Sequence, residues 1–202
     1  MNAIMLLDYM GVFVFAMSGL LAASGKKLDL FGGFIIAFVT ALGGGTLRDL
    51  LLNVEIGWIM NPNYIYIVIS GAIFALIFKK ALKHVRKTIF LFDSIGIAIF
   101  TISGVQKAIL FDMPVPVVII FGVITATFGG VIRDILCNEI PLIFRKELYA
   151  TACITGGIVY ICISNFGLNE TLNTVLSGAL IIIIRTISVV KKISLPVLND
   201  KL

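Results

Sequence analysis

Apolar residues in this chain gather into seven long runs instead of alternating with polar residues, as they would in an amphipathic strand. The runs cover residues 4–24, 30–54, 64–78, 89–106, 115–137, 149–163 and 172–190. A helix needs about 20 apolar residues to cross the hydrocarbon core of a bilayer, and runs of this kind favour helices over a barrel. The pattern predicts an all-α polytopic membrane protein with seven transmembrane helices.

The composition excludes a soluble domain. The mean hydropathy is +1.10 and only 13% of the 202 residues are charged, whereas soluble domains carry about 25% charged residues. No Lys or Arg precedes Lys26, so the first run lacks the positive start of a secretory signal and is interpreted as a helix. The cysteines Cys137, Cys153 and Cys162 have no metal-ligand spacing. They are interpreted as small buried residues, and no cofactor is expected.

Positive charge is distributed unevenly between the two ends of the runs. Most basic loop residues follow the first, third, fifth and seventh runs, and only Lys107 would lie on the opposite side. They are Lys26, Lys27, Lys79, Lys80, Lys83, Arg86, Lys87, Arg145, Lys146, Lys191, Lys192 and Lys201. The positive-inside rule then predicts an N-terminus outside and a C-terminus in the cytoplasm. The net charge of +5 needs no nucleic-acid partner to explain it.

The densest basic segment, KKALKHVRK at 79–87, has two interpretations. We favour a loop that sets the topology. The alternative is contact with anionic lipid head groups, since each basic residue near such a surface contributes roughly 1 kcal/mol. The candidate head-group residues are Lys79, Lys80, Lys83, Arg86 and Lys87.

The sequence contains an internal repeat. An ungapped comparison of the chain with itself aligns residues 4–53 with 89–138, with 17 identities in 50 positions. Polar identities include Asp8 with Asp93, Ser18 with Ser103, Thr40 with Thr125, Arg48 with Arg133, Asp49 with Asp134 and Asn53 with Asn138.

Each repeat holds three predicted helices, and an odd number makes the second copy enter the membrane from the opposite side. We therefore predict one transmembrane domain over residues 1–202, with a first repeat at 4–83, an inverted second repeat at 89–165 and a seventh helix at 170–190 without a counterpart. Inverted repeats are typical of transporters and channels, where discontinuous helices surround a site near the midplane.

Both repeats carry the same glycine motif, GGGTLRDLLLN at 43–53 and FGGVIRDILCN at 128–138. Each glycine costs a helix roughly 1 kcal/mol relative to alanine. We expect Gly44, Gly45, Gly129 and Gly130 to kink or unwind the second and fifth helices, which frees backbone groups to line a cavity. The alternative is that the small residues only allow close helix packing.

An Arg-Asp pair follows the glycines in each motif. A charge inside the membrane costs about 3 kcal/mol on insertion scales and marks a functional site by default, although such a pair can also be a buried strut between helices. Adjacent residues on a helix do not face each other. The sequence therefore predicts cross-pairing of Arg48 with Asp134 and of Arg133 with Asp49.

Other polar residues of the repeats also have alternative roles. Asp8 and Asp93 are interpreted as helix caps, and contact with an ion is the alternative. The candidate pore hydroxyls Ser18, Thr40, Ser103 and Thr125 could meet a dehydrated ion or bond back to their own helices. The sequence has no zinc spacing, nucleophile elbow or phosphate loop, so we do not expect an enzyme.

GGGTLRD, FGGVIRD and EIPLIFRKELYA at 139–150, within two inverted three-helix repeats and a seventh helix, resemble the prokaryotic branch of the trimeric intracellular cation channel family. The resemblance implies a homotrimer in the cell membrane of a prokaryote. Each protomer would carry a pore for potassium and sodium, lined by kinked helices two and five. By motif, Gly44, Gly45, Gly129 and Gly130 would be the kinks, and Arg48, Asp49, Arg133 and Asp134 the polar gate.

Two other functions remain open. A guanidinium and a carboxylate together would suit a zwitterion, and related bacterial sequences are described as glycine transporters, so a secondary transporter of glycine or a similar solute is the first alternative. The second is a lipid-binding membrane protein that transports nothing.

Overall fold

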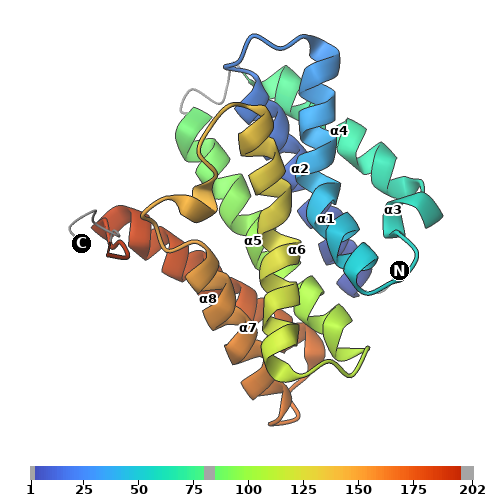
Figure 1. Cartoon of the computed structure of the whole chain (residues 1–202), viewed down its shortest axis with the longest axis vertical. Coiled ribbons are helices and arrows are strands. Elements are labelled where there is room, and N and C mark those ends of the chain that lie inside the picture. The colour runs from blue at the N-terminus through green and yellow to red at the C-terminus, as the bar shows by residue number, and fades with distance from the viewer. Residues whose placement is uncertain (1–2, 80–84, 197–202) are drawn as a thin grey trace, which may run out of the picture.

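The computed structural model describes residues 3–79 and 85–196, and the regular elements within these ranges are helices (Figure 1). In chain order they are α1 (Ala3–Ala23), α2 (Leu30–Leu51), α3 (Gly57–Met60), α4 (Asn63–Phe78), α5 (Val85–Ile109), α6 (Val115–Leu136), the 3-10 helix η1 (Leu142–Phe144), α7 (Ala150–Ser164) and α8 (Glu170–Lys191). The first and last residues of the long helices lie within a few residues of the ends of the apolar runs.

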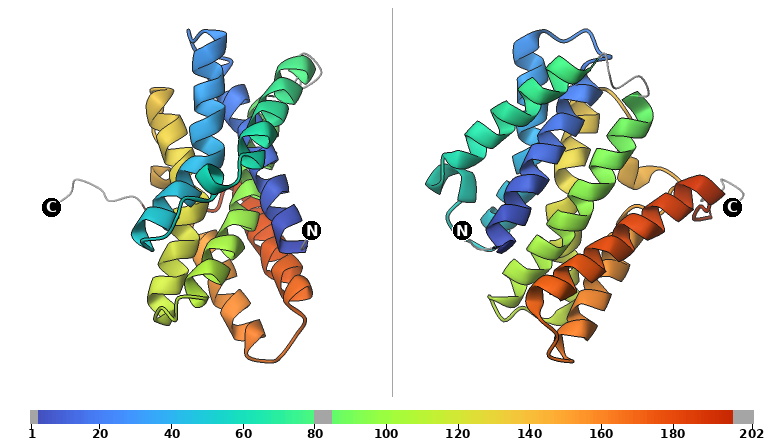
Figure 2. Two further views of the ribbon diagram at one scale, coloured as in Figure 1. Left: turned by 90° about the vertical axis from the view of Figure 1, so that its right-hand side faces the viewer. Right: turned by 180° about the vertical axis from the view of Figure 1, so that it is seen from behind.

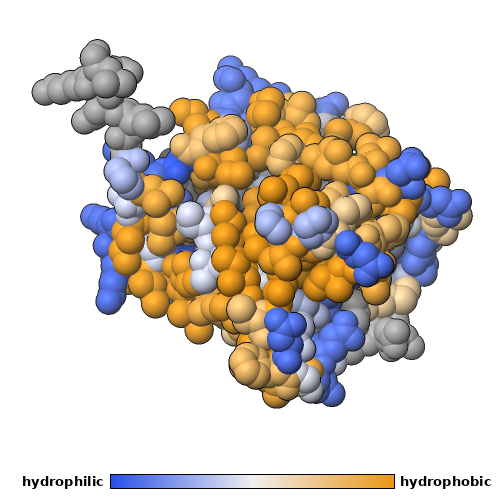
Figure 3. All heavy atoms as spheres, turned by 60° about the horizontal axis from the view of Figure 1, so that its bottom comes forward, coloured by the Kyte–Doolittle hydropathy of each residue, from blue (hydrophilic) through white to orange (hydrophobic). Residues whose placement is uncertain are grey.

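Five of the described helices, α1, α2, α5, α6 and α8, are long and apolar enough to cross a membrane. The helices α4 and α7 are also apolar but have 16 and 15 residues, which is shorter than the roughly 20 residues that span a bilayer. Many large apolar side chains are exposed on the outside of the helices, and Figure 3 shows one such face in orange. This surface is that of a multi-pass membrane protein.

The boundaries of equivalent helices agree with the alignment of the two sequence repeats. The alignment pairs the first and last residues of α2 with those of α6, and η1 and α7 follow α6 as α3 and α4 follow α2. Just beyond the two helices, Asn53 and Asn138 have left-handed backbones with φ of 54° and 55°. Asparagine adopts this conformation more readily than most residues, so the same residue type turns the chain after both helices.

The helices α2 and α6 cross in antiparallel directions, with glycines at the contact. A Cβ atom on Gly44 would overlap the carbonyl oxygen of Thr125, and one on Gly129 would overlap that of Thr40. Both glycines lie inside unbroken helices, so the prediction that they unwind the backbone is wrong, whereas the kink stays a prediction. They allow close helix packing instead.

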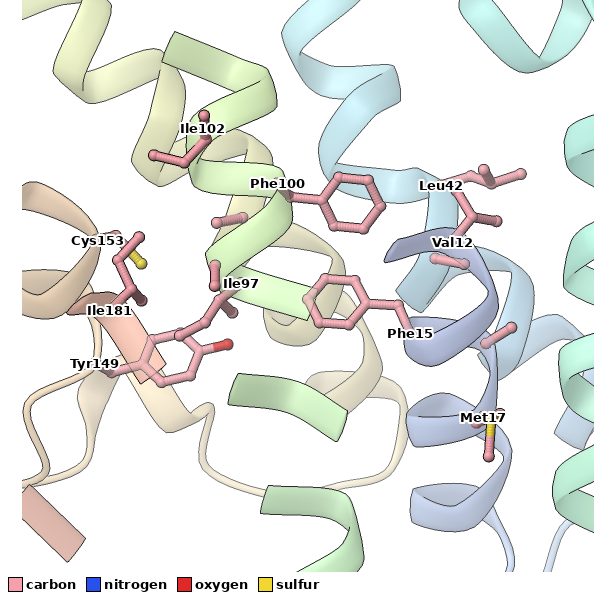
Figure 4. Packing of buried hydrophobic residues seen from close by; sticks show 14 of the residues in the cluster. Val12, Phe15, Met17, Leu42, Ile97, Phe100, Ile102, Tyr149, Cys153 and Ile181 are labelled. Atoms are coloured by element: carbon pink, nitrogen blue, oxygen red, sulfur yellow. The ribbon is translucent and has the colours of Figure 1, made fainter. Parts of the chain in front are cut away.

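The first helices of the two repeats, α1 and α5, pack through a matched pair of aromatic rings. The buried rings of Phe15 and Phe100 lie 5.1 Å apart between centroids (Figure 4). A Cβ atom on Gly96 would overlap the ring of Phe15, and one on Gly11 would lie 3.2 Å from the ring of Phe100. Each repeat thus supplies the glycine that accommodates the other repeat's phenylalanine.

The remaining long helices lie on opposite sides of this centre (Figure 2). The helix α4 packs mainly on α1, whereas α7 and α8 pack on each other and on α5 and α6. Because α8 has no counterpart in the first repeat among the described helices, it makes the two halves of the molecule unequal.

The crossing of α2 and α6 predicts that alanine substitution affects thermal stability differently at Gly44 and at Gly45. Gly44→Ala should lower the thermal unfolding temperature in detergent, because its methyl group meets backbone atoms that cannot move away, and overpacking costs about 1–3 kcal/mol. Gly45→Ala is the matched control, since its Cβ would be 3.7 Å from the nearest atom, an Arg48 nitrogen. It should leave the unfolding temperature unchanged or raise it. Equal unfolding temperatures for the two variants would contradict this role of Gly44.

Candidate functional site

The arginine of each motif pairs with its own neighbouring aspartate. Arg48 Nε lies 2.7 Å from Asp49 Oδ1, and Arg133 Nε lies 2.8 Å from Asp134 Oδ1. The predicted cross-pairing of Arg48 with Asp134 and of Arg133 with Asp49 is therefore wrong. The arginine side chain is long enough to reach the carboxylate of the next residue on the same helix.

The antiparallel crossing explains why cross-pairing cannot occur. Gly44 lies beside Thr125 and Gly129 beside Thr40, so each Arg-Asp pair lies beyond the crossing in its own helix direction. At 1.5 Å per residue, Arg48 and Asp134 are roughly 20 Å apart along the helix axis. The duplicated motif therefore forms two separate charge clusters, one at each end of the crossing.

The first charge cluster consists of Asp8, Arg48, Asp49 and Lys107. Asp49 is almost completely buried, and its Oδ1 accepts hydrogen bonds from Arg48 Nε at 2.7 Å and from Lys107 Nζ at 2.8 Å. Its Oδ2 accepts the backbone N–H of Gly57 at 3.1 Å. One carboxylate in this cluster thus holds two cationic side chains.

Asp8 has only hydroxyl partners among the contacts that the structure describes. It accepts hydrogen bonds from the Tyr64 hydroxyl and, at 3.4 Å, from Ser103 Oγ. Asp8, Arg48 and Asp49 line the same small cavity, whose volume is about 40 Å³ and whose walls also include Gly45 and Tyr64. This cavity brings two carboxylates together within the helix bundle.

The second charge cluster consists of Asp93, Arg133, Asp134 and Arg185. Asp93 is fully buried, with Oδ1 3.2 Å from Arg133 Nη1 and Oδ2 3.2 Å from Arg185 Nη2. Asp134 Oδ2 accepts the backbone N–H of Leu142 at 3.0 Å. This cluster therefore contains two buried arginines and two aspartates.

Arg185 comes from α8 and pairs with two carboxylates, because its Nη1 also lies 3.7 Å from Glu147 Oε2. Its guanidinium carbon lies 5.0 Å from the ring centre of Phe90 and 4.5 Å from that of Tyr149. Its side chain is 1% exposed. Stacking between two aromatic rings fixes a guanidinium in place.

The repeat also relates hydrogen bonds of the two clusters. Tyr64 donates to Asp8 as Tyr149 donates to Asp93. The N–H of Gly57 binds Asp49 as that of Leu142 binds Asp134. Equivalent residues of the two repeats therefore make equivalent hydrogen bonds. These residues include some beyond 53 and 138, where the sequence alignment ended.

The predicted pore hydroxyls divide into two kinds. Thr40 and Thr125 bond back to the carbonyl oxygens of Ile36 and Phe121, both at 2.6 Å. Ser18 instead accepts a hydrogen bond from Arg133 at 3.1 Å, and Ser103 donates to Asp8. The two serines thus belong to the charge clusters, while the threonines satisfy their own helices.

The capping role predicted for Asp8 and Asp93 is wrong. The helices α1 and α5 begin at Ala3 and Val85, so both aspartates lie inside their helices. Their carboxylates bind side chains of other helices instead.

The predicted head-group residues are only partly described. Lys79 and Lys87 are exposed, whereas Lys80, Lys83 and the side chain of Arg86 lie outside the part of the chain that the structure describes. Within residues 3–79 and 85–196, no group of three His, Cys, Asp or Glu side chains is arranged so that it could hold a metal ion.

Four residues that belong to the clusters or donate hydrogen bonds to them have no role assigned from the sequence. Tyr64 and Tyr149 are identical residues at equivalent positions of the two repeats, a signal that a longer alignment would have found. Lys107 is the one basic loop residue on its side of the predicted topology, and Arg185 lies within the last apolar run. Neither has an equivalent basic residue in the repeat, so the repeat could not indicate their partners.

The clusters predict that Asp93→Asn destabilises the protein much more than Asp8→Asn. Asp93→Asn leaves two buried guanidinium groups short of a negative charge, and breaking a buried ion pair costs about 3–5 kcal/mol. Asp8→Asn weakens hydrogen bonds to hydroxyls, which contribute about 1 kcal/mol each. Thermal unfolding in detergent measures both losses. Equal losses would mean that charge pairing at Asp93 does not stabilise the fold.

The family model described as "Glycine transporter" matches the chain twice, over residues 5–80 and 90–165. The two matches are spaced along the chain as the repeats of the sequence and structure are, because the alignment of the repeats pairs residue 5 with residue 90 and residue 80 with residue 165. Together the two matches cover most of the chain.

Curated relatives are bacterial membrane proteins. A UPF0126 membrane protein of Vibrio cholerae is 43% identical over 157 residues, which are 77% of this chain and 66% of the relative. The UPF0126 inner membrane protein YadS of Escherichia coli is 38% identical over 156 residues, which are 76% of this chain and 75% of the relative. The chain thus spans about two thirds to three quarters of the length of these relatives.

A solved structure matches nearly the whole chain. It is the TRIC trimeric intracellular cation channel orthologue from Rhodobacter sphaeroides, with a TM-score of 0.90 and 31% identity over 96% of this chain and 100% of the other. The curated relatives are named as membrane proteins, and the solved structure is named as a cation channel. The chain belongs to the family that the glycine-transporter model describes and is a homologue of the prokaryotic TRIC channels.

Proposed function

We propose that the protein is a passive channel for the monovalent cations potassium and sodium, with a pathway in each protomer lined by α2 and α6. The observation that carries the proposal is the small cavity lined by Asp8, Arg48 and Asp49, which is enclosed by residues of α1, α2, α3, α4 and α5. It offers carboxylate oxygens to a cation inside an apolar bundle. The Rhodobacter relative, named as a cation channel, supports the same activity.

Charge balance makes such a pathway passable for a cation. An isolated arginine in a low-dielectric path would repel a cation strongly. Arg48 and Arg133 are instead paired with Asp49 and Asp134 at 2.7 and 2.8 Å, which removes most of this barrier. We assign these four residues to the polar gate, together with the glycines Gly44, Gly45, Gly129 and Gly130 at the constriction.

We further propose seven membrane spans in two inverted three-helix repeats, with the N-terminus outside and the C-terminus in the cytoplasm of a prokaryotic cell. Contacts of the lysines that follow α1 and α4 support placing the C-terminal ends of α1, α4 and α6 on the same side of the membrane. Lys26 Nζ, after α1, lies 2.7 Å from Glu139, after α6. Lys79 Nζ, after α4, lies 3.4 Å from the carbonyl oxygen of Ser24. The positive-inside rule places this end in the cytoplasm.

We propose a homotrimer surrounded by membrane lipids, with Lys79 and Lys87 near the lipid head groups. The trimer rests on the name of the Rhodobacter relative, which calls that channel trimeric.

Glycine transport is the second candidate, favoured by the description of the matching family model. A guanidinium and a carboxylate could bind the two ends of glycine. The cavity of about 40 Å³ is far smaller than typical small-molecule sites, which have volumes of roughly 300–1,000 Å³. It fits a single ion better than an amino acid, so we rank the channel first.

Ion flux from proteoliposomes tests this function. With potassium chloride inside, an impermeant organic cation outside and a proton ionophore to balance charge, the protein should release potassium without saturation and without competition from glycine. Asp49→Asn combined with Asp134→Asn should slow the release severalfold, because Arg48 and Arg133 then repel cations. Monodisperse gel filtration of the variant excludes misfolding as the cause. Saturable glycine uptake without potassium release would overturn the channel.

Cysteine labelling tests the proposed orientation. After replacement of the three native cysteines, Glu55→Cys should react with an impermeant maleimide on intact cells, because it follows α2 on the outer side. Lys27→Cys, after α1, should react only in opened cells. The reverse pattern would contradict the orientation.

A further inference from the structure

A groove runs between α1, α5 and α8, apart from the cavity at Arg48 and Asp49. Its volume is about 240 Å³, close to the lower limit of typical small-molecule sites, roughly 300 Å³. The helix α5 packs on both α1 and α8 and lies between them in the right-hand view of Figure 2. Asp8 lines both the groove and the small cavity, so the two spaces meet at one carboxylate.

The lining of the groove is polar at one end and otherwise apolar. The polar end contains Asp8, Ser103, Gln106 and Thr174. The apolar lining includes Ile95, Ala98, Ile99, Gly178, Ala179 and Ile182. Among the residues that the structure describes, no Lys, Arg or His lines the groove. A space of this kind suits an amphiphile, which has one polar end and one apolar chain.

The polar end of the groove lies near one face of the membrane. Gln106 is within the last turn of α5, which ends at Ile109, and Thr174 is about 6 Å along α8 from its first residue, Glu170. Ile182 is about 18 Å along α8 from the same residue. The apolar core of a bilayer is about 30 Å thick. The groove therefore extends from the level of the lipid head groups toward the middle of the membrane.

The charges at the polar end favour a positive head group. The described hydrogen bonds of Asp8 come from hydroxyl groups only, and Asp8 Oδ1 has a single donor, Ser103 Oγ at 3.4 Å. A second carboxylate lies at the rim, since Glu170 Oε1 is 3.2 Å from Gln106 Nε2. An ammonium forms strong hydrogen bonds with carboxylates, whereas a head group with only negative charge is repelled by them.

We propose that the groove binds one acyl chain of a phospholipid whose head group carries an ammonium, and that this ammonium donates a hydrogen bond to Asp8 Oδ1. The acyl chain lies along α5 and α8, and the hydroxyl groups of Ser103 and Thr174 flank the head group. This site is at the opposite end of the helices from Lys79, which we place near other head groups. The bound ammonium also lies beside the small polar cavity, because Asp8 belongs to both.

Thermal unfolding of the purified, full-length protein in mild detergent tests this site. Lysophosphatidylethanolamine is the probe, because it has one acyl chain and an ammonium, and a lipid that binds the folded state raises the unfolding temperature. Each variant is compared with its own unfolding temperature without lipid. Asp8→Asn should need about fivefold more of this lipid for the same rise, the scale of one partly exposed ion pair. Its response to lysophosphatidylglycerol, which lacks the ammonium, should be unchanged.

Filling the groove tests the position of the acyl chain. A Cβ atom on Gly178 would lie 4.0 Å from the Cβ of Ala98, which is an ordinary contact, so Gly178→Leu places its added atoms in the groove. It should weaken the response to lysophosphatidylethanolamine at least as much as Asp8→Asn does. Should this variant fail to fold, Ala179→Phe provides the same test, because Ala179 is an exposed residue of the groove.

Glu55→Gln is the matched control. It also removes a carboxylate, from an exposed residue that follows α2 and does not line the groove, and it should respond to the lipid as the wild type does. Responses of Asp8→Asn and Gly178→Leu equal to that of Glu55→Gln would overturn the lipid site. A lower subunit number of Gly178→Leu in light scattering, with an unchanged lipid response, would show that a second copy of the chain covers the groove, which also overturns it.

Discussion

The contact of α2 and α6 through Gly44 and Gly129 determines the rest of the arrangement. At both glycines the backbone of one helix lies against a carbonyl group of the other, in space that a methyl group would fill. Because the crossing is antiparallel, residues that follow it in each helix diverge toward opposite ends. A duplicated sequence motif thereby becomes two polar sites, and the glycine contact lies between them.

Each polar site must balance its charges within an apolar bundle. In both, the carboxylate beside the motif arginine also accepts a backbone N–H from the segment that follows the helix, so the carboxylates are fixed by the fold. The cations that complete the balance come from outside the motif and are unequal, because Lys107 is partly exposed and Arg185 is buried.

Much of the fold could be predicted from the sequence, because the apolar runs and the repeat are strong signals. The alignment of the repeats also pairs the bounds of α2 with those of α6. The cross-pairing of Arg48 with Asp134 was a wrong prediction, because sequence identity indicates which residues are equivalent and not how far apart a crossing places them. The role of Gly44 was also uncertain, since glycines that unwind a helix and glycines that let helices touch form the same pattern.

The partners of Lys107 and Arg185 required coordinates. Arg185 comes from α8, which has no counterpart among the described helices, so no repeat signal pointed to Asp93. Lys107 aligns with Ala22 in the first repeat, and only the packing of α5 near the end of α2 shows that it reaches Asp49. Asymmetric features of a repeated protein are thus the ones that sequence comparison of its halves cannot predict.

Planar-bilayer recording of the purified protein in asymmetric potassium chloride tests the central claim, a passive cation pathway, most directly. The account predicts discrete current steps that reverse near the potassium equilibrium potential. Steps that reverse near the chloride equilibrium potential, or a protein that carries no current while it remains folded, would contradict it.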